Sequence, residues 1–544
     1  MGSEQMRQTQ IAGEKDLIVI GAGPAGYNLA AEAAGRGLDV LLIEKKNLGG
    51  TCLNRGCIPT KAYLALSALY RRSLEAERMG LELSGVHLNV AKLLAHKNDC
   101  VQRLREQIAY LLEQKGVTFL QGEATVLGDG LVQVESRGDE ASEGDSAKTA
   151  SEAAAEDVTD AKTQAEPKAN TEGHTEGNMA DQAPKVSLWR ALRIVLATGG
   201  EPKPAEAVLG EVDSALLASP RLVTSDDLLD EEKAGLLLPD GSLPKQVAIV
   251  GAGIIGMEFA SFFSDLGLIV HVFEYQDQIL AQLDQDLGRA LERILKRRGV
   301  KFLKSVEIQK AALEGETEQV QLTWQKRAKT ARMAETAPKT KEEKASFDLV
   351  LVASGREPRG LSALDPKLLA AESRGFLLCD EHYESSIPGV YAIGDVRAGS
   401  RQLAHAAEAE ARDLLALWLD LPRPLRMDVV PAVVYTDPEL AACGHSEASA
   451  QAAGLAYKVA MIHTNSNGKS LIEGAERGFV KLLYDPEQLT LLGAALCCER
   501  AGELISEISQ AMSRGASMAD LAAVIRPHPS FSEMITQVTA EFLG

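Results

Sequence analysis

The chain has 544 residues, of which 45% are hydrophobic, and it carries a formal net charge of −20. This length predicts several domains instead of a single core, and the negative charge argues against nucleic acid as the main partner. No run of about eighteen apolar residues occurs, so no membrane span is expected. The polar N-terminus and the seven scattered cysteines predict a cytoplasmic protein in a reducing compartment.

The first predicted elements form a nucleotide-binding unit that runs from Asp16 to Glu44. A short apolar strand leads through the pattern G-A-G-x-x-G into a helical segment and then into a second apolar strand. Gly21 permits the tight turn, Gly23 allows a pyrophosphate to approach the backbone, and Gly26 allows close packing of helix on strand. Free N–H groups at the helix start attract the phosphates, and Glu44 can accept hydrogen bonds from ribose hydroxyls.

Two cysteines follow this unit directly, within the stretch GGTCLNRGCIPTK from Gly49 to Lys61. Four residues separate Cys52 from Cys57, and we interpret this spacing as placing both thiols one helical turn apart on one face, close enough for a disulfide. A zinc site would need a second ligand pair at the correct spacing, so no metal site is predicted. A thioredoxin-like site would read C-x-x-C.

Two segments of biased composition interrupt the chain. The first, from Asp139 to Asp181, contains twelve acidic residues and three lysines, and it predicts a disordered insertion at about 138–186. The second, from Lys326 to Lys344, contains seven basic and three acidic residues and predicts an insertion at about 325–345. Opposite charges could draw the two segments together, but two solvated loops that extend surface hairpins are the favoured interpretation.

A second unit of the same kind runs from Gln246 to Glu274 and aligns with the first without a gap. Gly251, Gly253 and Gly256 occupy the corresponding positions, so a second dinucleotide site is expected. Glu274 would repel a 2′-phosphate, and the sequence EYQDQ that begins there offers no arginine to bind one. The second nucleotide is therefore predicted to be NAD(H) and not NADP(H).

Three further motifs are ATGG at 197–200, AIGD at 392–395 and HPSFSE at 528–533. Together with the cysteine motif and the two nucleotide units, they make the chain resemble the class I FAD-dependent pyridine nucleotide–disulfide oxidoreductases. The stretches LAHAAEAE, VVYTDPELAACG and AGELISEISQAMSRGAS are most similar to the dihydrolipoamide dehydrogenase branch of that family. The resemblance covers nearly the whole chain apart from the N-terminal tail and the two insertions.

This resemblance implies an α/β fold. Two Rossmann-like, doubly wound domains would bind FAD and NAD, and a C-terminal α+β domain would form a homodimer. The implied domains are an N-terminal tail at 1–14, an FAD-binding domain at 15–219, an NAD-binding domain at 220–353, a central FAD-contacting segment at 354–428 and a dimerisation domain at 429–544.

The resemblance also assigns roles to the reacting residues. Cys52 is expected to exchange with a dithiol substrate, and Cys57 is expected to lie beside the flavin. His528 of one subunit would complete the site of the other and act as the base, since histidine has a suitable intrinsic pKa. Glu533 would hold its imidazole, by the same logic as in a catalytic triad.

An ion pair between Lys61 and Glu258 is implied next to the flavin, so both residues would serve catalysis and cofactor binding. The remaining residues expected to bind the two dinucleotides are Gly21, Gly23, Pro24, Ala25, Gly26, Glu44, Lys45, Gly50, Thr51, Ala124, Thr198, Gly199, Gly251, Gly253, Ile254, Ile255, Gly256, Glu274, Val306, Gly355, Gly394, Asp395, Leu403, Ala404 and His405.

The implied reaction is the oxidation of dihydrolipoamide with NAD+ as the final acceptor. The lipoyl group would arrive on a protein of a 2-oxo-acid dehydrogenase or glycine cleavage complex. Two alternatives stay open: another flavin disulfide reductase that works with NADH in the reverse direction, and a flavoprotein subunit whose main task is docking in a multienzyme complex.

Three positions depart from the usual pattern of that branch. Arg55 stands between the cysteines where Val is frequent, and it either influences the thiols or faces solvent. Arg526 stands just before the histidine motif, where a histidine is frequent. Cys498–Glu499–Arg500 replaces the commoner Gly-Pro-Gly run. The adjacent pair Cys497–Cys498 is interpreted as part of a buried strand and not as a second redox centre.

Overall fold

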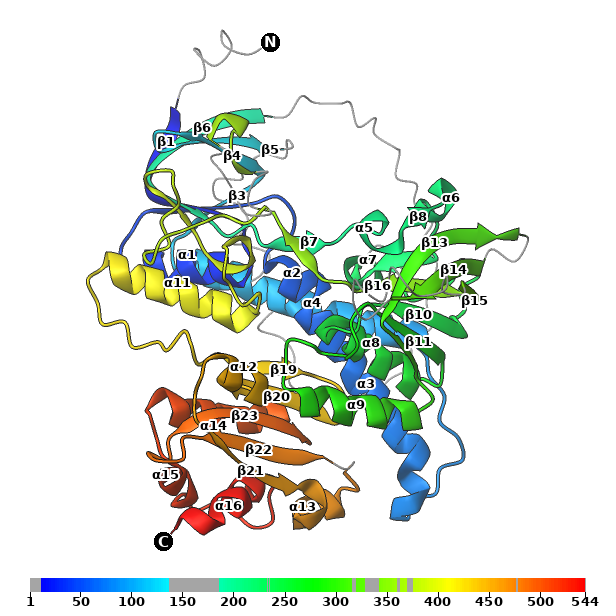
Figure 1. Cartoon of the computed structure of the whole chain (residues 1–544). Coiled ribbons are helices and arrows are strands. Elements are labelled where there is room, and N and C mark those ends of the chain that lie inside the picture. The colour runs from blue at the N-terminus through cyan, green and yellow to red at the C-terminus, as the bar shows by residue number, and fades with distance from the viewer. Residues whose placement is uncertain are drawn as a thin grey trace, which may run out of the picture.

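The computed structural model describes residues 11–136, 185–231, 233, 235–315, 319–327, 342–359, 363–368, 375–475 and 478–543. Most of the predicted acidic insertion at 138–186 and the middle of the basic insertion at 325–345 lie outside these residues. Two α/β domains lie side by side, and the C-terminal domain lies below them in the view of Figure 1. Within the described ranges, no helix is long and apolar enough to cross a membrane.

The first domain is built on a seven-stranded sheet in the order β3-β2-β1-β6-β5-β4, with β18 paired to β6. The last four residues of β1 and the first four of β2 are buried, as is typical of parallel strands covered on both faces. Helices α1 and α11 pack side by side on this domain (Figure 1). The elements are β1 (Ile11–Ile20), α1 (Pro24–Ala34), β2 (Val40–Glu44), β3 (Thr118–Gln121), β4 (Glu123–Gly128), β5 (Leu131–Ser136), β6 (Lys185–Leu196), β18 (Val390–Ala392) and α11 (Ala404–Trp418).

Strand β1 begins at Ile11, inside the range 1–14 that the sequence predicted as a tail. The prediction of this boundary is wrong because β6 supplies a partner: it starts at Lys185 and pairs with β1 from Ile11 onward. Strands β5 and β6 also form an antiparallel hairpin, whose outermost pair is Ser136 with Lys185. The acidic insertion therefore connects the two ends of a hairpin, and β6 includes the last residues of the range predicted for it.

The second domain has a five-stranded parallel sheet in the order β12-β11-β10-β16-β9 and a four-stranded sheet in the order β15-β14-β13-β8. In the second sheet, β15, β14 and β13 are antiparallel neighbours, and β8 pairs with β13 in parallel. The basic insertion lies between β14 and β15, which are antiparallel neighbours. The elements are β8 (Glu211–Val212), β9 (Leu222–Thr224), β10 (Gln246–Val250), α8 (Ile254–Asp265), β11 (Ile269–Glu274), α9 (Gln285–Arg297), β12 (Lys301–Lys304), β13 (Val306–Glu314), β14 (Gln319–Lys326), β15 (Glu343–Phe347) and β16 (Leu349–Val352).

The C-terminal domain consists of an antiparallel sheet in the order β19-β20-β23-β22-β21, with helices packed against it. Its elements are β19 (Ala432–Val434), β20 (Glu439–Gly444), α12 (Glu447–Ala452), β21 (Lys458–His463), α13 (Gly468–Ile472), β22 (Phe479–Tyr484), β23 (Leu491–Cys498), α14 (Ala501–Ser513), α15 (Met518–Ala522) and α16 (Glu533–Thr539). Short elements elsewhere are β7 (Gly200–Pro202), α5 (Glu206–Leu209), α6 (Ser214–Leu217), α7 (Ser225–Leu229) and β17 (Arg356–Pro358).

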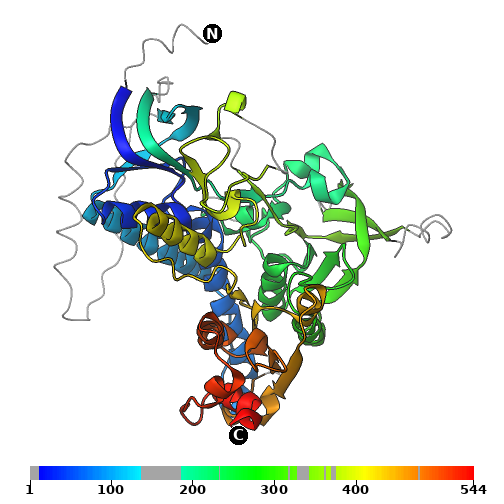
Figure 2. The ribbon, with the colours of Figure 1, turned by 60° about the vertical axis from the view of Figure 1, so that its left-hand side comes forward.

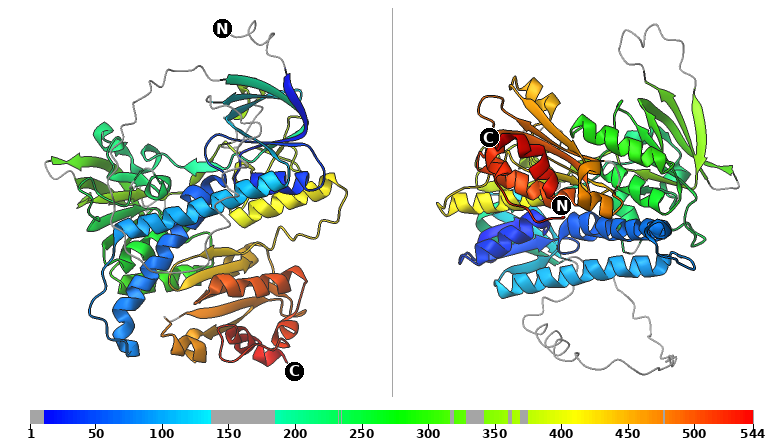
Figure 3. Two further views of the ribbon diagram at one scale, coloured as in Figure 1. Left: turned by 180° about the vertical axis from the view of Figure 1, so that it is seen from behind. Right: turned by 90° about the horizontal axis from the view of Figure 1, so that it is seen from below.

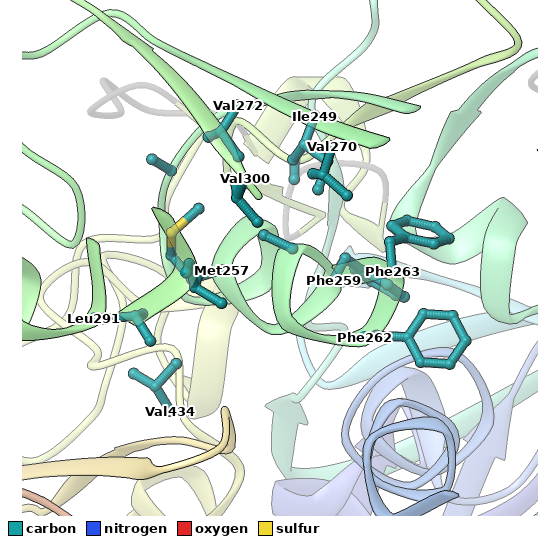
Figure 4. Packing of buried hydrophobic residues seen from close by; sticks show 14 of the residues in the cluster. Ile249, Met257, Phe259, Phe262, Phe263, Val270, Val272, Leu291, Val300 and Val434 are labelled. Atoms are coloured by element: carbon teal, nitrogen blue, oxygen red, sulfur yellow. The ribbon is translucent and has the colours of Figure 1, made fainter. Parts of the chain in front are cut away.

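Two helices connect the domains to one another. Helix α3 (Cys57–Glu75) descends from the first domain past the second, and α4 (Val90–Gln114) packs against it (Figure 3). Tyr63 of α3 stacks on Phe262 of α8, with ring centroids 5.1 Å apart. Val434 of the C-terminal domain belongs to the same apolar cluster as α8 (Figure 4). Helix α8 therefore lies where all three domains meet.

Candidate active site

The cysteine motif is attached to the first nucleotide-binding loop by two glycines. The Gly49 N–H donates to the carbonyl oxygen of Ala22 at 2.9 Å. Gly50 has φ +59°, and a Cβ there would lie 2.6 Å from the Cα of Gly23. Only glycine fits this approach, so α2 (Gly50–Arg55) starts in contact with the loop that is expected to hold phosphates.

Cys52 and Cys57 form a disulfide, with their Cα atoms 4.7 Å apart. Cys52 lies in α2, and Cys57 is the first residue of α3, because Gly56 ends the first helix with φ −143° and ψ −110°. The disulfide is as predicted, but the expectation of two thiols one turn apart on a single helix is wrong. A separation of five residues on one continuous helix would turn the second thiol away from the first.

The first nucleotide unit has the geometry that its glycines predict. Gly21 has φ +102°, and a Cβ at Gly26 would overlap the carbonyl oxygen of Gly21. The carboxylate of Glu44 accepts hydrogen bonds from the backbone N–H of Ala22 and of Lys46, both at 2.8 Å. Each carboxylate oxygen keeps lone-pair capacity for a ribose hydroxyl.

The second unit repeats this geometry. Gly251 has φ +108°, and a Cβ at Gly256 would overlap the carbonyl oxygen of Gly251. The carboxylate of Glu274 accepts from the backbone N–H of Ala252 and of Gln276, both at 2.7 Å. Cβ atoms at Gly23 and Gly253 would meet no neighbour within 4 Å, which leaves the space that a pyrophosphate needs.

A cavity opens beside the first unit at the carboxyl end of its strands. Its walls include Gly21, Glu44, Lys45, Ala124, Thr198 and Arg359. Among the described residues, the buried Oγ1 atom of Thr198 has no hydrogen-bond partner, which is unusual for a buried hydroxyl. Since the cavity, the unpaired hydroxyl and the phosphate loop converge here, the residues present fit a dinucleotide such as FAD.

Further predicted cofactor residues lie at the start of α11 and on the turn before it. Gly394 donates its N–H to Glu410 at 2.7 Å, and the ring Nε2 of His405 lies 2.8 Å from the carbonyl oxygen of Pro431. Burial raises the pKa of the Asp395 carboxyl, while the charge of Arg356 opposes this shift. A carboxyl group held in such a place is suited to hydrogen-bond hydroxyl groups of a ligand.

A charged pair joins the first nucleotide domain to the second. Lys61 lies one turn after Cys57 on α3, and its Nζ donates to both carboxylate oxygens of Glu258 at 3.0 Å. Glu258 lies on α8 with its side chain 3% exposed. Tyr435 of the C-terminal domain donates its backbone N–H to Glu258 at 2.9 Å, and its ring centroid lies 4.6 Å from the Lys61 ammonium. All three domains thus contribute to this cluster.

The C-terminal motif forms a histidine–carboxylate pair. Nδ1 of His528 lies 2.7 Å from Oε1 of Glu533, and the N–H of Ser530 donates to Oε2 of the same carboxylate at 2.8 Å. The hydrogen bond from His528 lowers the pKa of the Glu533 carboxyl. The pairing leaves Nε2 of His528 as the nitrogen that faces outward, on a side chain that is 81% exposed.

Comparison with known proteins places these motifs in a family. Residues 15–411 match the family model described as pyridine nucleotide-disulphide oxidoreductase, and residues 430–539 match the model of its dimerisation domain. The chain belongs to this family. It is therefore a flavoprotein disulfide oxidoreductase with a redox-active disulfide, from a family that uses FAD and a pyridine nucleotide. The predicted family and fold class are confirmed.

Individual relatives resemble the oxidoreductase over nearly its full length. Dihydrolipoyl dehydrogenase 3 of Pseudomonas aeruginosa is 33% identical over 534 residues, which cover 97% of this chain and 98% of the relative. Dihydrolipoyl dehydrogenase of Trypanosoma brucei brucei is 32% identical over 531 residues, which cover 96% and 95%. The solved structure of the HOCl-induced flavoprotein disulfide reductase RclA from Escherichia coli has a TM-score of 0.73 at 23% identity and covers 96% and 99%, a likeness of fold.

The two halves of the predicted catalytic set do not meet within one chain of the oxidoreductase. Helix α16, which begins at Glu533, lies at the foot of the C-terminal domain, whereas α2 lies in the upper part of the molecule (Figures 1 and 2). Lys61 and Glu258, by contrast, are brought together although 197 residues separate them in the sequence.

Several contacts at the site could not be found from the sequence. Tyr435 and Arg359 were not singled out because their roles depend on neighbours far along the chain. Val306 is 5% exposed and belongs to an apolar cluster, so only its backbone can face a nucleotide. The side chain of Arg55 is 22% exposed, and its NH1 lies 3.9 Å from a carboxylate oxygen of Asp230.

The remaining departures and cysteines also have structural partners. Cys497 and Cys498 are buried in different apolar clusters, on opposite faces of β23, as expected for adjacent residues in a strand. Glu499 forms an ion pair with Arg72 at 3.0 Å. Arg526 donates to Glu507 at 2.6 Å. In the described part of the chain, no group of three or more His, Cys, Asp or Glu side chains is arranged to hold a metal ion.

Proposed function

We propose that the oxidoreductase oxidises dihydrolipoamide, through the Cys52–Cys57 disulfide and FAD, with NAD+ as the final acceptor. The observation that carries this proposal is the position of the disulfide. It joins α2, which touches the first nucleotide loop, to α3, which carries Lys61 one turn later. A disulfide in this place can exchange electrons with a flavin on one side and with a thiol substrate on the other.

The two cysteines have different tasks because their environments differ. Cys57 is the first residue of a helix of 19 residues, and a helix N-terminus stabilises a thiolate. Cys57 is therefore the better leaving group, and Cys52 is the sulfur that substrate attacks. This agrees with the roles that the family resemblance assigns.

The exchange then proceeds in two balanced steps. His528 takes the proton of a substrate thiol, and the thiolate attacks Cys52, so that the bond to Cys57 breaks and Cys57 leaves as a thiolate. The second substrate thiol attacks the substrate sulfur bound to Cys52 and passes its proton to Cys52, which leaves as a thiol while the substrate disulfide forms. The substrate loses two electrons and two protons, and the protein disulfide gains the two electrons.

The charged groups around these sulfurs support the exchange. Glu533 orients the His528 ring and stabilises its protonated form. Glu258 and Tyr435 hold the ammonium of Lys61, which lies on α3 one turn after Cys57, and a positive charge there would stabilise electron density on a bound ring. When bound, FAD supplies the two-electron carrier between the reduced cysteines and the pyridine nucleotide.

The second nucleotide is proposed to be NAD(H), on the basis of Glu274. Its carboxylate is fixed by two backbone N–H donors at the end of β11, where the ribose of a dinucleotide is expected. The working form is proposed to be a homodimer in which His528 serves the disulfide of the partner subunit. The exposed His528 and the match to a dimerisation domain support this arrangement.

The substrate is proposed to arrive on a lipoyl-bearing protein of a 2-oxo-acid dehydrogenase or glycine cleavage complex. The similar dihydrolipoyl dehydrogenases support this choice. Cys498–Glu499–Arg500 replaces a Gly-Pro-Gly run of that branch, and Glu499 forms an ion pair with Arg72. A difference in the carrier protein is expected to involve this position.

Steady-state assays with purified enzyme test the proposal. Oxidation of dihydrolipoamide by NAD+ is compared with the reduction of a panel of low-molecular-weight and protein disulfides by NADH. We expect dihydrolipoamide to have the highest kcat/KM. A higher value for another disulfide would replace this function by that of a reductase, and a protein that binds partners without turnover would favour a docking subunit. A colourless protein that cannot be reconstituted with FAD would contradict both enzymatic functions.

A further inference from the structure

An arginine lies against the residue next to Glu274, although the sequence around Glu274 contains none. Arg327 comes directly after β14, some fifty residues from the second nucleotide unit. Its guanidinium carbon lies 3.4 Å from the ring centroid of Tyr275, and NH1 donates to the Tyr275 carbonyl oxygen at 3.0 Å. This is a stacked cation–π contact, which planar guanidinium groups favour.

Backbone hydrogen bonds hold Arg327 in this place. Its N–H donates to the carbonyl oxygen of Ser305 at 2.8 Å, and the N–H of Ser305 donates to the carbonyl oxygen of Gln276 at 2.8 Å. The end of β14, the start of β13 and the loop after β11 are therefore tied together. Gln276 also donates its N–H to Glu274, so a fixed positive charge lies beside the segment that carries Glu274.

The guanidinium keeps donors for a ligand. Of its five N–H groups, one is used by the Tyr275 carbonyl. Among the described residues, no carboxylate forms an ion pair with Arg327. Tyr275 is 53% exposed, so a nucleotide that enters from solvent meets the tyrosine and the arginine together.

We propose that Arg327 is a specificity-determining residue that binds the 2′-phosphate of NADP(H). It thereby reduces the degree to which the enzyme prefers NAD(H) over NADP(H). This inference rests on the proposed function, in which Glu274 faces the adenosine ribose. The carboxylate of Glu274 repels a 2′-phosphate. The guanidinium of Arg327, which lies on the next residue, Tyr275, attracts it. NAD(H) stays the better substrate, but NADP(H) is accepted to an extent that Glu274 alone would not allow.

Binding of adenosine fragments to the FAD-loaded enzyme tests this directly. Isothermal titration compares 2′,5′-ADP with 5′-AMP, which differ by the 2′-phosphate. A hydrogen bond to a charged group predicts that Arg327→Gln weakens 2′,5′-ADP binding about tenfold to a hundredfold, with less than a twofold change for 5′-AMP. The wild-type affinity for 2′,5′-ADP is also expected to fall more steeply with salt than that of the variant.

Two further variants control for charge and fold. Arg289→Gln removes an exposed charge from α9 of the same domain and is expected to leave both affinities unchanged. Arg327→Lys keeps the charge but not the planar fork, and it should retain part of the preference. An unchanged flavin spectrum and melting temperature establish that each variant is folded.

The possible results separate the two claims. If 5′-AMP binds to the wild type but 2′,5′-ADP does not, or if Arg327→Gln weakens both equally, the inference is wrong and the proposed NAD site stands. If neither fragment binds, both are wrong. Selective loss of 2′,5′-ADP binding, accompanied by a matching rise in KM for NADPH and not for NADH, supports the inference.

Discussion

The two nucleotide-binding units share nearly every local contact but have different surroundings. In both, a glycine with positive φ follows the first strand, and a terminal glutamate accepts two backbone hydrogen bonds. The loops that follow the second strand of each unit also make corresponding contacts with the glycine loop. The N–H of Gly49 donates to the carbonyl oxygen of Ala22 in the first unit, and the N–H of Leu280 donates to that of Ala252 in the second, both at 2.9 Å.

The units differ in the segments that come after the glutamate. In the first, Gly50 brings the disulfide helices against the phosphate loop, and a cavity encloses the ribose end. In the second, Tyr275 is exposed and Arg327 stacks on one face of its ring. The local unit therefore makes a dinucleotide site. We propose that its surroundings decide whether the ligand stays bound, as expected for FAD, or exchanges, as expected for a pyridine nucleotide.

The most severe way to break this comparison is to remove the disulfide that only the first unit carries. Cys57→Ser is expected to lower turnover with dihydrolipoamide by at least about a thousandfold, because no sulfur then passes electrons on. FAD and NAD+ binding should persist, since both units stay intact. Stopped-flow reduction by dithiol measures the effect.

Cys52→Ser is the matched control, because it removes the sulfur proposed to be attacked by substrate and keeps the one proposed to lie beside the flavin. It should abolish dithiol turnover equally. Of the two variants, only Cys52→Ser should retain an absorbance band at long wavelength, because only this variant keeps a Cys57 thiolate to interact with FAD. If Cys57→Ser retained turnover above one tenth of wild type, the disulfide would not be the relay.

Alanine substitutions at corresponding glycines of the two units should impair the binding of different cofactors. A Cβ at Gly26 or Gly256 would overlap a backbone carbonyl, and such overpacking costs about 1–3 kcal/mol or more. Gly26→Ala is expected to yield protein without FAD. Gly256→Ala should keep its FAD and lose affinity for NAD+, measured by titration.

Gly37 and Gly267 are the matched controls for this pair. Both have positive φ, yet a Cβ at either would meet nothing within 4 Å. Alanine there is expected to cost about 1 kcal/mol of stability and to leave both affinities intact. Loss of FAD from the Gly256 variant would contradict the assignment of the two units.

Glu533 tests the dithiol side of the first unit alone. Glu533→Gln is expected to lower dihydrolipoamide turnover about a hundredfold, with no effect on NADH oxidation by an artificial acceptor. The hydrogen bond from His528 lowers the pKa of the Glu533 carboxyl, so the carboxylate is charged above the ordinary glutamate range and loses its charge only as the pH falls below it. The deficit should therefore persist throughout the neutral range.

The exposed carboxylate of Glu541 provides a control, since Glu541→Gln alters charge in the same region without touching the pair. Equal losses of turnover in Glu533→Gln and Glu541→Gln would mean that turnover depends on the negative charge of this region and not on the orientation of His528.

The smallest loss of turnover is expected from a change in the Lys61–Glu258 ion pair, which joins the first nucleotide domain to the second. Lys61→Met leaves Glu258 with one hydrogen bond, from Tyr435. We expect turnover to fall about tenfold, from loss of one electrostatic contact near the ring, and the melting temperature to drop, because a buried carboxylate loses its partner. Lys61→Arg should restore part of both, and an unchanged flavin reduction potential in Lys61→Met would rule out the electrostatic role.

Features that depend on a short stretch of chain were predictable. A tight turn before a helix needs glycine at defined positions, buried parallel strands need continuous apolar runs, and a disulfide needs two near cysteines. Residues 16–61 satisfy all three conditions within themselves. The nucleotide units and the redox pair were thus predictable from the order of residues alone.

Features that depend on distant segments could not be predicted in this way. Strand β1 extends to Ile11 only because β6 returns beside it, and the bend at Gly56 sets the disulfide geometry.

The sequence by itself determined the family, the two nucleotide loops and the reacting sulfurs, because each is encoded by neighbouring residues. Only the tertiary structure decided that Tyr435 completes the Lys61–Glu258 pair and that Arg327 lies on Tyr275. These contacts join side chains from segments that are far apart along the chain, and they form only when the domains pack.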